Sequence, residues 1–241
     1  VTINEPNVYM LCGYIDGVFP PGKKDLNSAY LVMRNMVRGH AAAYHALHEL
    51  QPQAQVGTAL HYQSIHPARQ WLPFDRWLAN FIRKNMFYSF PDALVDGKFR
   101  FLNKKESIPA AANTLDYFGL NYYTRTLVNF QLTAYKNLFY RLSFPPGAEV
   151  SETNHMANAP DGFFEALHWA KSYQQPVIVT ENGIEDKSDK LRPSYLFEHI
   201  HQMWRAVNFN WPVKGYFHWT LVDNFEWERG WTQRFGLWEL D

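Results

Sequence analysis

Short apolar runs that stop at a carboxylate are the most informative pattern in this chain of 241 residues. The clearest run is residues 177–180, where four β-branched side chains lead into Glu181, Asn182 and Gly183. A continuous run of this kind is typical of a strand that is buried on both faces of a parallel sheet. The pattern therefore predicts that Glu181 lies at the carboxyl end of a buried strand, with Gly183 allowing a sharp turn beyond it.

The first six residues repeat this pattern, because Val1-Thr2-Ile3 lead into Asn4 and Glu5 before Pro6. Pro6 has no backbone N–H and favours extended geometry in the residue before it, so we predict Glu5 in an extended conformation at the tip of a strand. The two glutamates can meet only if the sheet curls or closes. Retaining glycoside hydrolysis requires two carboxyl groups about 5–5.5 Å apart, so Glu5 and Glu181 are candidate catalytic residues.

Further apolar patterns alternate between strand and helix periodicity, which predicts a parallel sheet with helical crossovers in one domain, residues 1–241. Residues 7–24 and 96–107 are predicted to be loop and surface connection, and residues 127–132 a β-excursion. The predicted helices are 25–50 (beginning at Asp25 or Asn27), 75–87, 161–173 and 193–208, and the predicted strands are 1–3, 55–61, 115–122, 177–180 and 213–219.

Composition narrows the classes of partner. Lys plus Arg and Asp plus Glu number 23 each, so no net charge favours nucleic acid or an anionic membrane. The single cysteine, Cys12, excludes an internal disulfide and a cysteine-rich zinc site, and we expect a cytoplasmic protein. His40, His45 and His48 lack the His-Glu-x-x-His order of a zinc protease, and we interpret them as core or interface residues. We expect no metal or other cofactor and no membrane-spanning segment.

Four motifs follow one another along the chain. They are Thr2-Ile3-Asn4-Glu5-Pro6, Gly119-Leu120-Asn121-Tyr122-Tyr123-Thr124, Val179-Thr180-Glu181-Asn182-Gly183 and Trp219-Thr220-Leu221-Val222-Asp223-Asn224-Phe225-Glu226-Trp227. In this order they resemble the motifs of glycoside hydrolase family 1, the β-glucosidases and β-galactosidases, and the resemblance extends over the whole chain.

The resemblance implies a (β/α)8 barrel of the α/β class. In the family the Asn-Glu-Pro motif closes strand four of eight, so this chain is expected to supply strands 4–8 only. We therefore expect a catalytic domain truncated at both ends, without the three βα units before Val1 and without the closing helix. The Gln, His-Trp pair and Arg that the family places on its first three strands would then lie outside this chain.

The resemblance also implies roles for the residues at the strand ends. Glu181 would be the nucleophile, and Glu5 would be the acid/base, with its pKa raised by the neighbouring carboxylate. Asn4 would contact the sugar 2-hydroxyl, and Tyr123, with Asn121 beside it, would orient the nucleophile.

The expected glycone site comes from the end of the chain. Trp219 would be the platform under the sugar ring, Glu226 and Trp227 would contact the 4- and 6-hydroxyls, and Phe235 would line the same pocket. Because a carboxylate repels phosphate, Glu226 favours a neutral hexose over a 6-phosphorylated one. A buried Glu226 without a polar ligand would be costly.

These residues imply a retaining β-glycosidase, most simply a β-glucosidase, that acts on a small β-glycoside or short oligosaccharide. The alternative is an inactive fragment or relic that only binds carbohydrate. The missing N-terminal segment or a homo-oligomer is a possible protein partner. A Rossmann-type nucleotide binder is disfavoured because no Gly-x-Gly-x-x-Gly follows a predicted strand.

Overall fold

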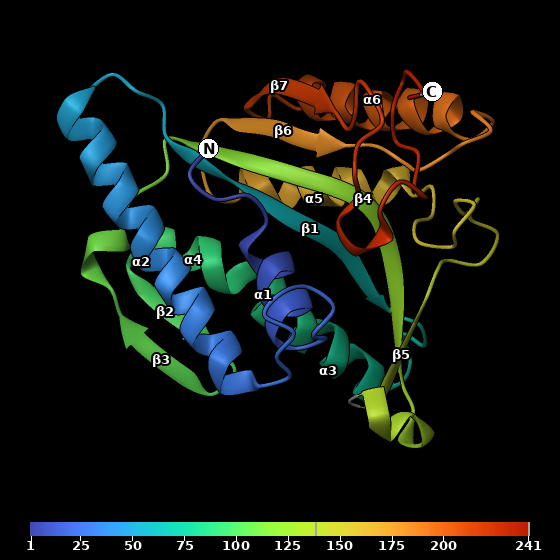
Figure 1. The fold of residues 1–241 in the computed structure, drawn as a ribbon, viewed down its shortest axis with the longest axis horizontal. Coiled ribbons are helices and arrows are strands. Elements are labelled where there is room, and N and C mark those ends of the chain that lie inside the picture. The colour runs from blue at the N-terminus through green and yellow to red at the C-terminus, as the bar shows by residue number, and fades with distance from the viewer. Residues whose placement is uncertain (138, 241) are drawn as a thin grey trace.

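Four parallel strands form the centre of the protein in a computed structural model that describes residues 1–137 and 139–240. Their order in the sheet is β1 (Gly57–Pro67), β4 (Tyr117–Phe130), β6 (Val177–Asn182) and β7 (Val213–His218). A fifth strand, β5 (Tyr140–Ser143), pairs antiparallel with the carboxyl end of β4 (Figure 1). Four of the five predicted strands, 55–61, 115–122, 177–180 and 213–219, are therefore confirmed as parallel strands of one sheet.

Helices cover the sheet as the strand–helix alternation predicts. Helix α5 (Pro160–Lys171) contacts β1, β4 and β6, while α6 (Arg192–Asn208) packs on β7 and α5 (Figure 1). The remaining elements are α1 (Pro6–Tyr14), α2 (Leu26–Leu50), α3 (Pro73–Ile82), a π-helical turn (Arg83–Tyr88), α4 (Ser89–Asp96), β2 (Lys98–Phe101), β3 (Lys104–Ser107) and 3-10 turns at Pro109–Ala111, Leu132–Asn137 and Trp227–Arg229.

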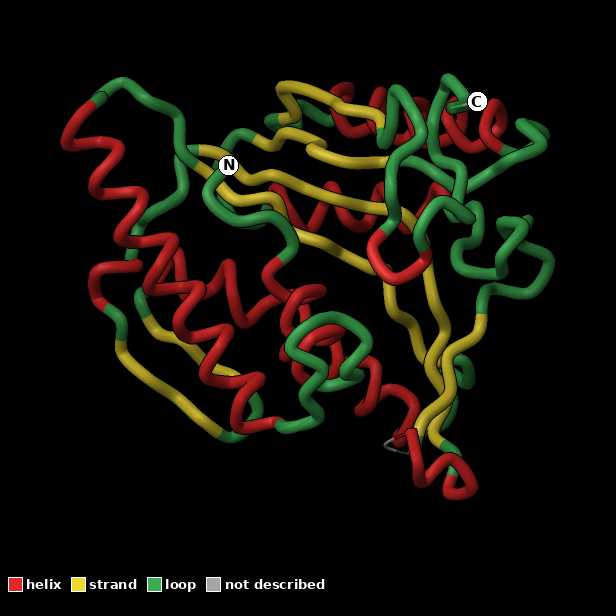
Figure 2. Tube along the Cα trace, in the orientation of Figure 1, coloured by secondary structure: helices red, strands yellow, loops and turns green. Residues whose placement is uncertain are grey.

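Strand register brings the sequence motifs to one level of the sheet. His61 of β1 pairs with Asn121 of β4, and Asn121 pairs with Glu181 of β6. One layer earlier, Leu120 and Val179 are fully buried and anchor this register in the core. Long loops gather beyond the carboxyl ends of these strands, as Figure 2 shows. The three polar side chains therefore face the edge at which α/β barrels carry their chemistry.

The first residues are a shorter element than predicted. They pair in parallel with β1 through a single bridge between Asn4 and Ala59, rather than forming a full strand. The backbone bonds are Thr2 N–H to Gly57 O (2.9 Å), Ala59 N–H to Ile3 O (3.2 Å) and Glu5 N–H to Ala59 O (2.8 Å). The predicted position beside the second strand is correct, but the pairing ends where the chain turns at Glu5.

The predicted extended conformation of Glu5 is wrong. Glu5 has φ 45° and ψ 57°, in the left-handed region, and it precedes helix α1, which begins at Pro6. Proline suits the first helical position, because the N–H that it lacks would have no helical partner there. The predicted loop over residues 7–24 therefore contains a helix that Pro6 starts rather than a strand that Pro6 ends.

Other boundaries also differ from the sequence prediction. The predicted connection 96–107 contains the hairpin β2–β3, and the predicted helix 75–87 begins at Pro73 and continues through a π-helical turn to Asp96. The β-excursion is the continuation of β4, which pairs with β5 beyond residue 126. Helix α2 is confirmed, and its N-cap is Asp25, whose carboxylate accepts the backbone N–H groups of Asn27 and Ser28.

Two apolar clusters hold these elements. The larger one joins the sheet to its helices, and a smaller one lies beyond the strand ends. Within the described residues, no helix combines the length and apolar character that crossing a membrane requires. The smaller cluster contains Tyr123, Met156, Ile184, Tyr195 and Phe235, with Leu191 and Trp219 packed against it.

Candidate active site

Asn121 holds Glu5 and the residue that precedes Glu181. Its side-chain amide donates to Glu5 Oε1 (2.9 Å) and to Asn4 Oδ1 (3.1 Å), while its carbonyl oxygen accepts the Thr180 hydroxyl (2.5 Å). Asn121 is fully buried, so these bonds fix its orientation. The left-handed backbone at Glu5, of a kind that costs of order 1–3 kcal/mol for a non-glycine residue, places that carboxylate on Asn121.

Glu181 is held by Tyr123. The Tyr123 hydroxyl donates to Glu181 Oε2 at 2.5 Å. Burial and the negative charge of Glu5 together raise the pKa of Glu181 to about 7, against the lowering effect of the Tyr123 hydrogen bond. The carboxyl of Glu181 therefore changes charge near neutral pH.

Glu5 behaves in the opposite way. Burial acts to raise its pKa, but the charge and close contact of His61 and the bond from Asn121 together lower it below the ordinary value. The predicted raised pKa of Glu5 is therefore wrong for this structure. His61 and Asn121 together outweigh burial at Glu5, and the raised pKa belongs to Glu181.

His61 is the residue of this site that the sequence prediction missed. Its Nδ1 lies 3.3 Å from Glu5 Oε1, and both side chains are about one-fifth exposed. The signal was present, because the second predicted strand ended at His61, at the same edge as Asn121 and Glu181.

The structure brings three of the four predicted glycone residues into contact with one another or with Tyr123. Trp219 Nε1 donates to Glu226 Oε1 (3.2 Å), which also accepts the Asn224 amide (2.9 Å). Phe235 is buried and meets the Tyr123 ring edge-on at 6.2 Å. Glu226 is half-buried and already has two donors, so its charge requires no sugar to be satisfied.

Trp227 lies apart from this group. Its side chain is 67% exposed, and its ring stacks on Phe19 at 5.1 Å, in the segment that follows α1. Trp227 is the first residue of the 3-10 turn Trp227–Arg229, for which Glu226 is the N-cap. The structure thus places the Trp227 side chain against Phe19 rather than beside Trp219 and Phe235.

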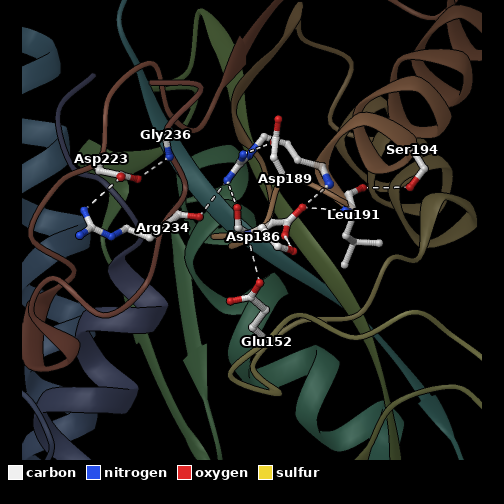
Figure 3. Close-up of polar contacts among 10 residues, drawn as sticks. Glu152, Asp186, Asp189, Leu191, Ser194, Asp223, Arg234 and Gly236 are labelled. Atoms are coloured by element: carbon white, nitrogen blue, oxygen red, sulfur yellow. Dashed lines mark hydrogen bonds and ion pairs between the residues drawn. The ribbon is translucent and has the colours of Figure 1, made fainter. Parts of the chain in front are cut away.

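A network of buried charges fixes the segment that carries the glycone residues (Figure 3). The Arg234 carbonyl accepts the Asp186 N–H (2.8 Å) and the Arg192 guanidinium (3.0 Å), and the Arg234 side chain reaches Asp223 Oδ2 (3.1 Å). Asp223 Oδ1 also accepts the Gly236 N–H (2.8 Å). These bonds join the loop after β6 to the segment after β7, and so position Trp219 and Phe235 over the strand ends.

Gly183 supports the same segment through close approach. A Cβ at this position would lie 1.8 Å from the Trp219 carbonyl oxygen, so only glycine fits. Gly183 was predicted to allow a turn beyond Glu181. The structure gives a more specific reason for glycine at this position, which is the close approach of its backbone to the Trp219 carbonyl.

Other features lie away from this edge. A cavity of about 660 Å³ lies between α4 and α5 near the amino ends of the strands, lined by residues that include Asp92, Trp169 and Tyr173. In the part of the chain that the structure describes, no three His, Cys, Asp or Glu side chains are grouped to hold a metal ion.

Comparison with known proteins finds relatives over the whole chain. The model of glycosyl hydrolase family 1 matches residues 1–241. The chain is 33% identical to a β-galactosidase of Sulfolobus acidocaldarius and 31% identical to β-glucosidase A of Thermotoga maritima, covering 100% of this chain but 50% and 58% of those proteins. The chain therefore spans little more than half the length of these relatives.

Solved structures agree with the fold. A β-glycosidase from Pyrococcus horikoshii superimposes with a TM-score of 0.89 at 32% identity, over 99% of this chain and 55% of that one. A family 1 β-glucosidase from Thermotoga maritima superimposes with a TM-score of 0.90 at 28% identity, over 100% and 58%. The predicted fold class is confirmed, since the described strands and helices form part of a (β/α)8 barrel. On the family match over its whole length, the chain belongs to glycosyl hydrolase family 1.

Proposed function

We propose that the protein containing this chain hydrolyses terminal β-D-glucosyl or β-D-galactosyl residues with retention of configuration, Glu181 acting as nucleophile and Glu5 as acid/base. The observation that carries the proposal is the meeting of both glutamates at one strand edge, where Asn121 bonds to Glu5 and pairs in register with Glu181, and where the charge of Glu5 raises the pKa of Glu181. Solved β-glucosidase structures from Thermotoga maritima that superimpose on this chain contain deoxynojirimycin and castanospermine, which supports a small sugar-like substrate.

In the first step a Glu181 oxygen attacks the anomeric carbon while the glycosidic C–O bond breaks. The bonding electron pair stays on the leaving oxygen, which takes a proton from Glu5. Tyr123 holds Glu181 Oε2 and so orients the carboxylate for attack. In the second step Glu5 takes a proton from water, the water oxygen bonds to the anomeric carbon, and the ester to Glu181 breaks.

The nucleophile must be ionised for the first step. With a pKa near 7, Glu181 is only partly ionised at neutral pH. The family resemblance implies an arginine from the first three strands, whose positive charge would lower this pKa. We therefore propose that the remainder of the barrel completes the electrostatics of the site as well as its walls.

The glycone is proposed to be a neutral hexose. Glu226, held by Trp219 and Asn224, presents a carboxylate that accepts sugar hydroxyls and repels a phosphate group. Trp219 offers an aromatic face to the ring. Preference among glucose, galactose and fucose depends on the remainder of the glycone site.

A 2-deoxy-2-fluoro-β-glucoside with a good leaving group tests this proposal on the protein that contains the chain. The glycosyl-enzyme should accumulate, and peptide mass spectrometry should find the added sugar on Glu181. Glu181→Gln is the control and should remain unlabelled. The alternative, binding of carbohydrate without turnover, is favoured by the raised pKa of Glu181. Reversible sugar binding without labelling at any pH from 6 to 9 would support that alternative.

A further inference from the structure

His61 occupies a fixed position beside the proposed acid/base. Its backbone is held by β1 and by the Asn7 amide, which donates to the His61 carbonyl at 3.1 Å. The Nδ1 atom is 3.3 Å from Glu5 Oε1, is inaccessible to solvent and makes no hydrogen bond of regular geometry with the described residues. This buried ring nitrogen is therefore placed where it can share a proton with Glu5.

The surroundings keep the imidazole aimed at Glu5. The ring lies between Tyr123 and Phe87, with a centroid distance of 6.3 Å to each and interplanar angles of 27° and 50°. The titratable groups that face the pair from neighbouring elements are Cys12 of α1, Tyr123 of β4, Glu181 of β6 and His155 of the loop before α5.

We propose that His61 is a positioning residue that stores the proton which Glu5 delivers to the leaving group, so that Glu5 and His61 act as one acid/base pair. This inference rests on the proposed function of Glu5. It also removes a contradiction, because a glutamate with a lowered pKa is a poor proton donor on its own. The imidazole 3.3 Å away gives the pair a second site that can hold the proton.

One proton moves between His61, Glu5 and the substrate during the reaction. In the resting pair, His61 and Glu5 share one proton. As the glycosidic bond breaks, Glu5 gives this proton to the leaving oxygen, which leaves a neutral imidazole and a carboxylate. When water attacks the glycosyl-enzyme, its proton passes through Glu5 to His61 and restores the resting pair.

The pairing can be tested without turnover. We would measure the Glu5 carboxyl pKa by carbon NMR in a Glu181→Gln background, which removes the second carboxylate. His61→Asn keeps a hydrogen-bond donor near the Nδ1 position but cannot hold a positive charge. The Glu5 pKa should rise in His61→Asn and stay unchanged in the matched control His66→Asn. His66 is on the same strand and pairs with Glu165 (2.7 Å) outside the site. An unchanged Glu5 pKa in His61→Asn would overturn the pairing.

Kinetics test the proton delivery. With an alkyl β-glucoside, whose leaving oxygen needs a proton, kcat/KM should fall about 10-fold or more in His61→Asn. With a dinitrophenyl β-glucoside, which leaves without protonation, kcat/KM should change less than about 2-fold. The alkaline limb of the kcat/KM profile for the alkyl substrate should also move, while His66→Asn behaves as wild type.

Failure of the His61 proposal and failure of the proposed function would give different results. Equal losses of kcat/KM on both substrates would mean that His61 only supports the structure, and would overturn its role in proton storage. A wild-type protein that turns over neither substrate and is not labelled by the fluoro-glucoside would contradict the proposed function. The NMR comparison would still decide whether His61 and Glu5 form a pair.

Discussion

At the scale of single residues, the chemistry of this site depends on which neighbour each carboxylate has. Glu5 faces an imidazole and an amide donor, whereas Glu181 faces a phenol and the charge of Glu5. Two side chains of the same type thereby acquire pKa values shifted in opposite directions, although the directions are the reverse of those that an ionised nucleophile and a protonated acid require. The sequence indicated both glutamates, but it could not indicate the direction of each shift, because His61 reaches Glu5 only through the sheet register.

The two proposed roles predict different mutant phenotypes. Glu181→Gln should abolish nearly all turnover, because no other group can form the glycosyl-enzyme. Glu5→Ala should retain turnover of an activated aryl glycoside, which needs little protonation, and added azide should increase that turnover. Steady-state kinetics with and without azide would check this. Equal losses for both variants and no azide response would mean that the roles are misassigned.

The raised pKa of Glu181 also predicts a stability change. Because the folded-state pKa of about 7 lies above the ordinary value of 4.5, the contribution of Glu181 to folding is fully present below pH 4.5 and is lost as pH rises through 7. Glu181→Gln cannot ionise, so its unfolding free energy relative to wild type should grow over this window, by at most about 3 kcal/mol. Urea denaturation of the protein containing this chain from pH 4 to 8 would measure it.

Glu165→Gln is the matched control, because the pKa shift of Glu165 has the opposite sign. Burial acts to raise the pKa of Glu165, but bonds from His66 and Ser64 and the charge of Arg125 lower it. Its stabilising contribution is therefore present above its ordinary pKa and lost as pH falls. Glu165→Gln should be destabilised at neutral pH and approach wild type in acid. Parallel pH curves for the two variants would contradict the assigned shifts.

At the scale of elements, strand β6 and the segment after β7 depend on each other. The close approach of Gly183 to the Trp219 carbonyl and the Asp186–Arg234–Asp223 network hold the glycone residues over the strand ends. Sequence periodicity predicted β6, α2 and the order of the elements, because those signals are local. It could not predict that Pro6 begins a helix, since proline also ends strands.

Gly183→Ala should test the dependence between these elements. The added Cβ collides with backbone, so Trp219 or β6 must move, and overpacking of this kind costs about 1–3 kcal/mol. We expect a lower unfolding free energy and weaker binding of sugar-like inhibitors, measured by denaturation and calorimetry. Gly39→Ala is the control, because a Cβ there, on an exposed face of α2, meets nothing within 4 Å. That variant should be unchanged or about 0.5–1 kcal/mol more stable. Full inhibitor affinity in Gly183→Ala would show that the contact does not position the site.

At the scale of the whole molecule, the sheet has two edges that a closed barrel would not have. One edge is the segment 1–4 that bridges to β1, and the other is β7. Large apolar side chains are exposed beside the second edge, including Phe217 of β7 (62%) and Phe197 and Trp204 of α6 (75% and 60%). The chain also matches only about half of its relatives' length. We propose that strands outside these 241 residues cover both edges.

We therefore expect the 241-residue polypeptide, expressed by itself, to hydrolyse no aryl β-glucoside. At ~25 cal/mol per Å² of apolar surface, a few hundred Å² left exposed at the two edges amounts to several kcal/mol. That is comparable to the whole stability of about 5–15 kcal/mol that a typical fold has. Adding a polypeptide that carries the first three βα units of a family 1 relative should raise the melting temperature and produce activity. That activity should disappear with Glu181→Gln in this chain. A monomer that melts cooperatively and turns over substrate without any addition would refute this expectation, and would show that four parallel strands and one bridge suffice to hold the two glutamates in place.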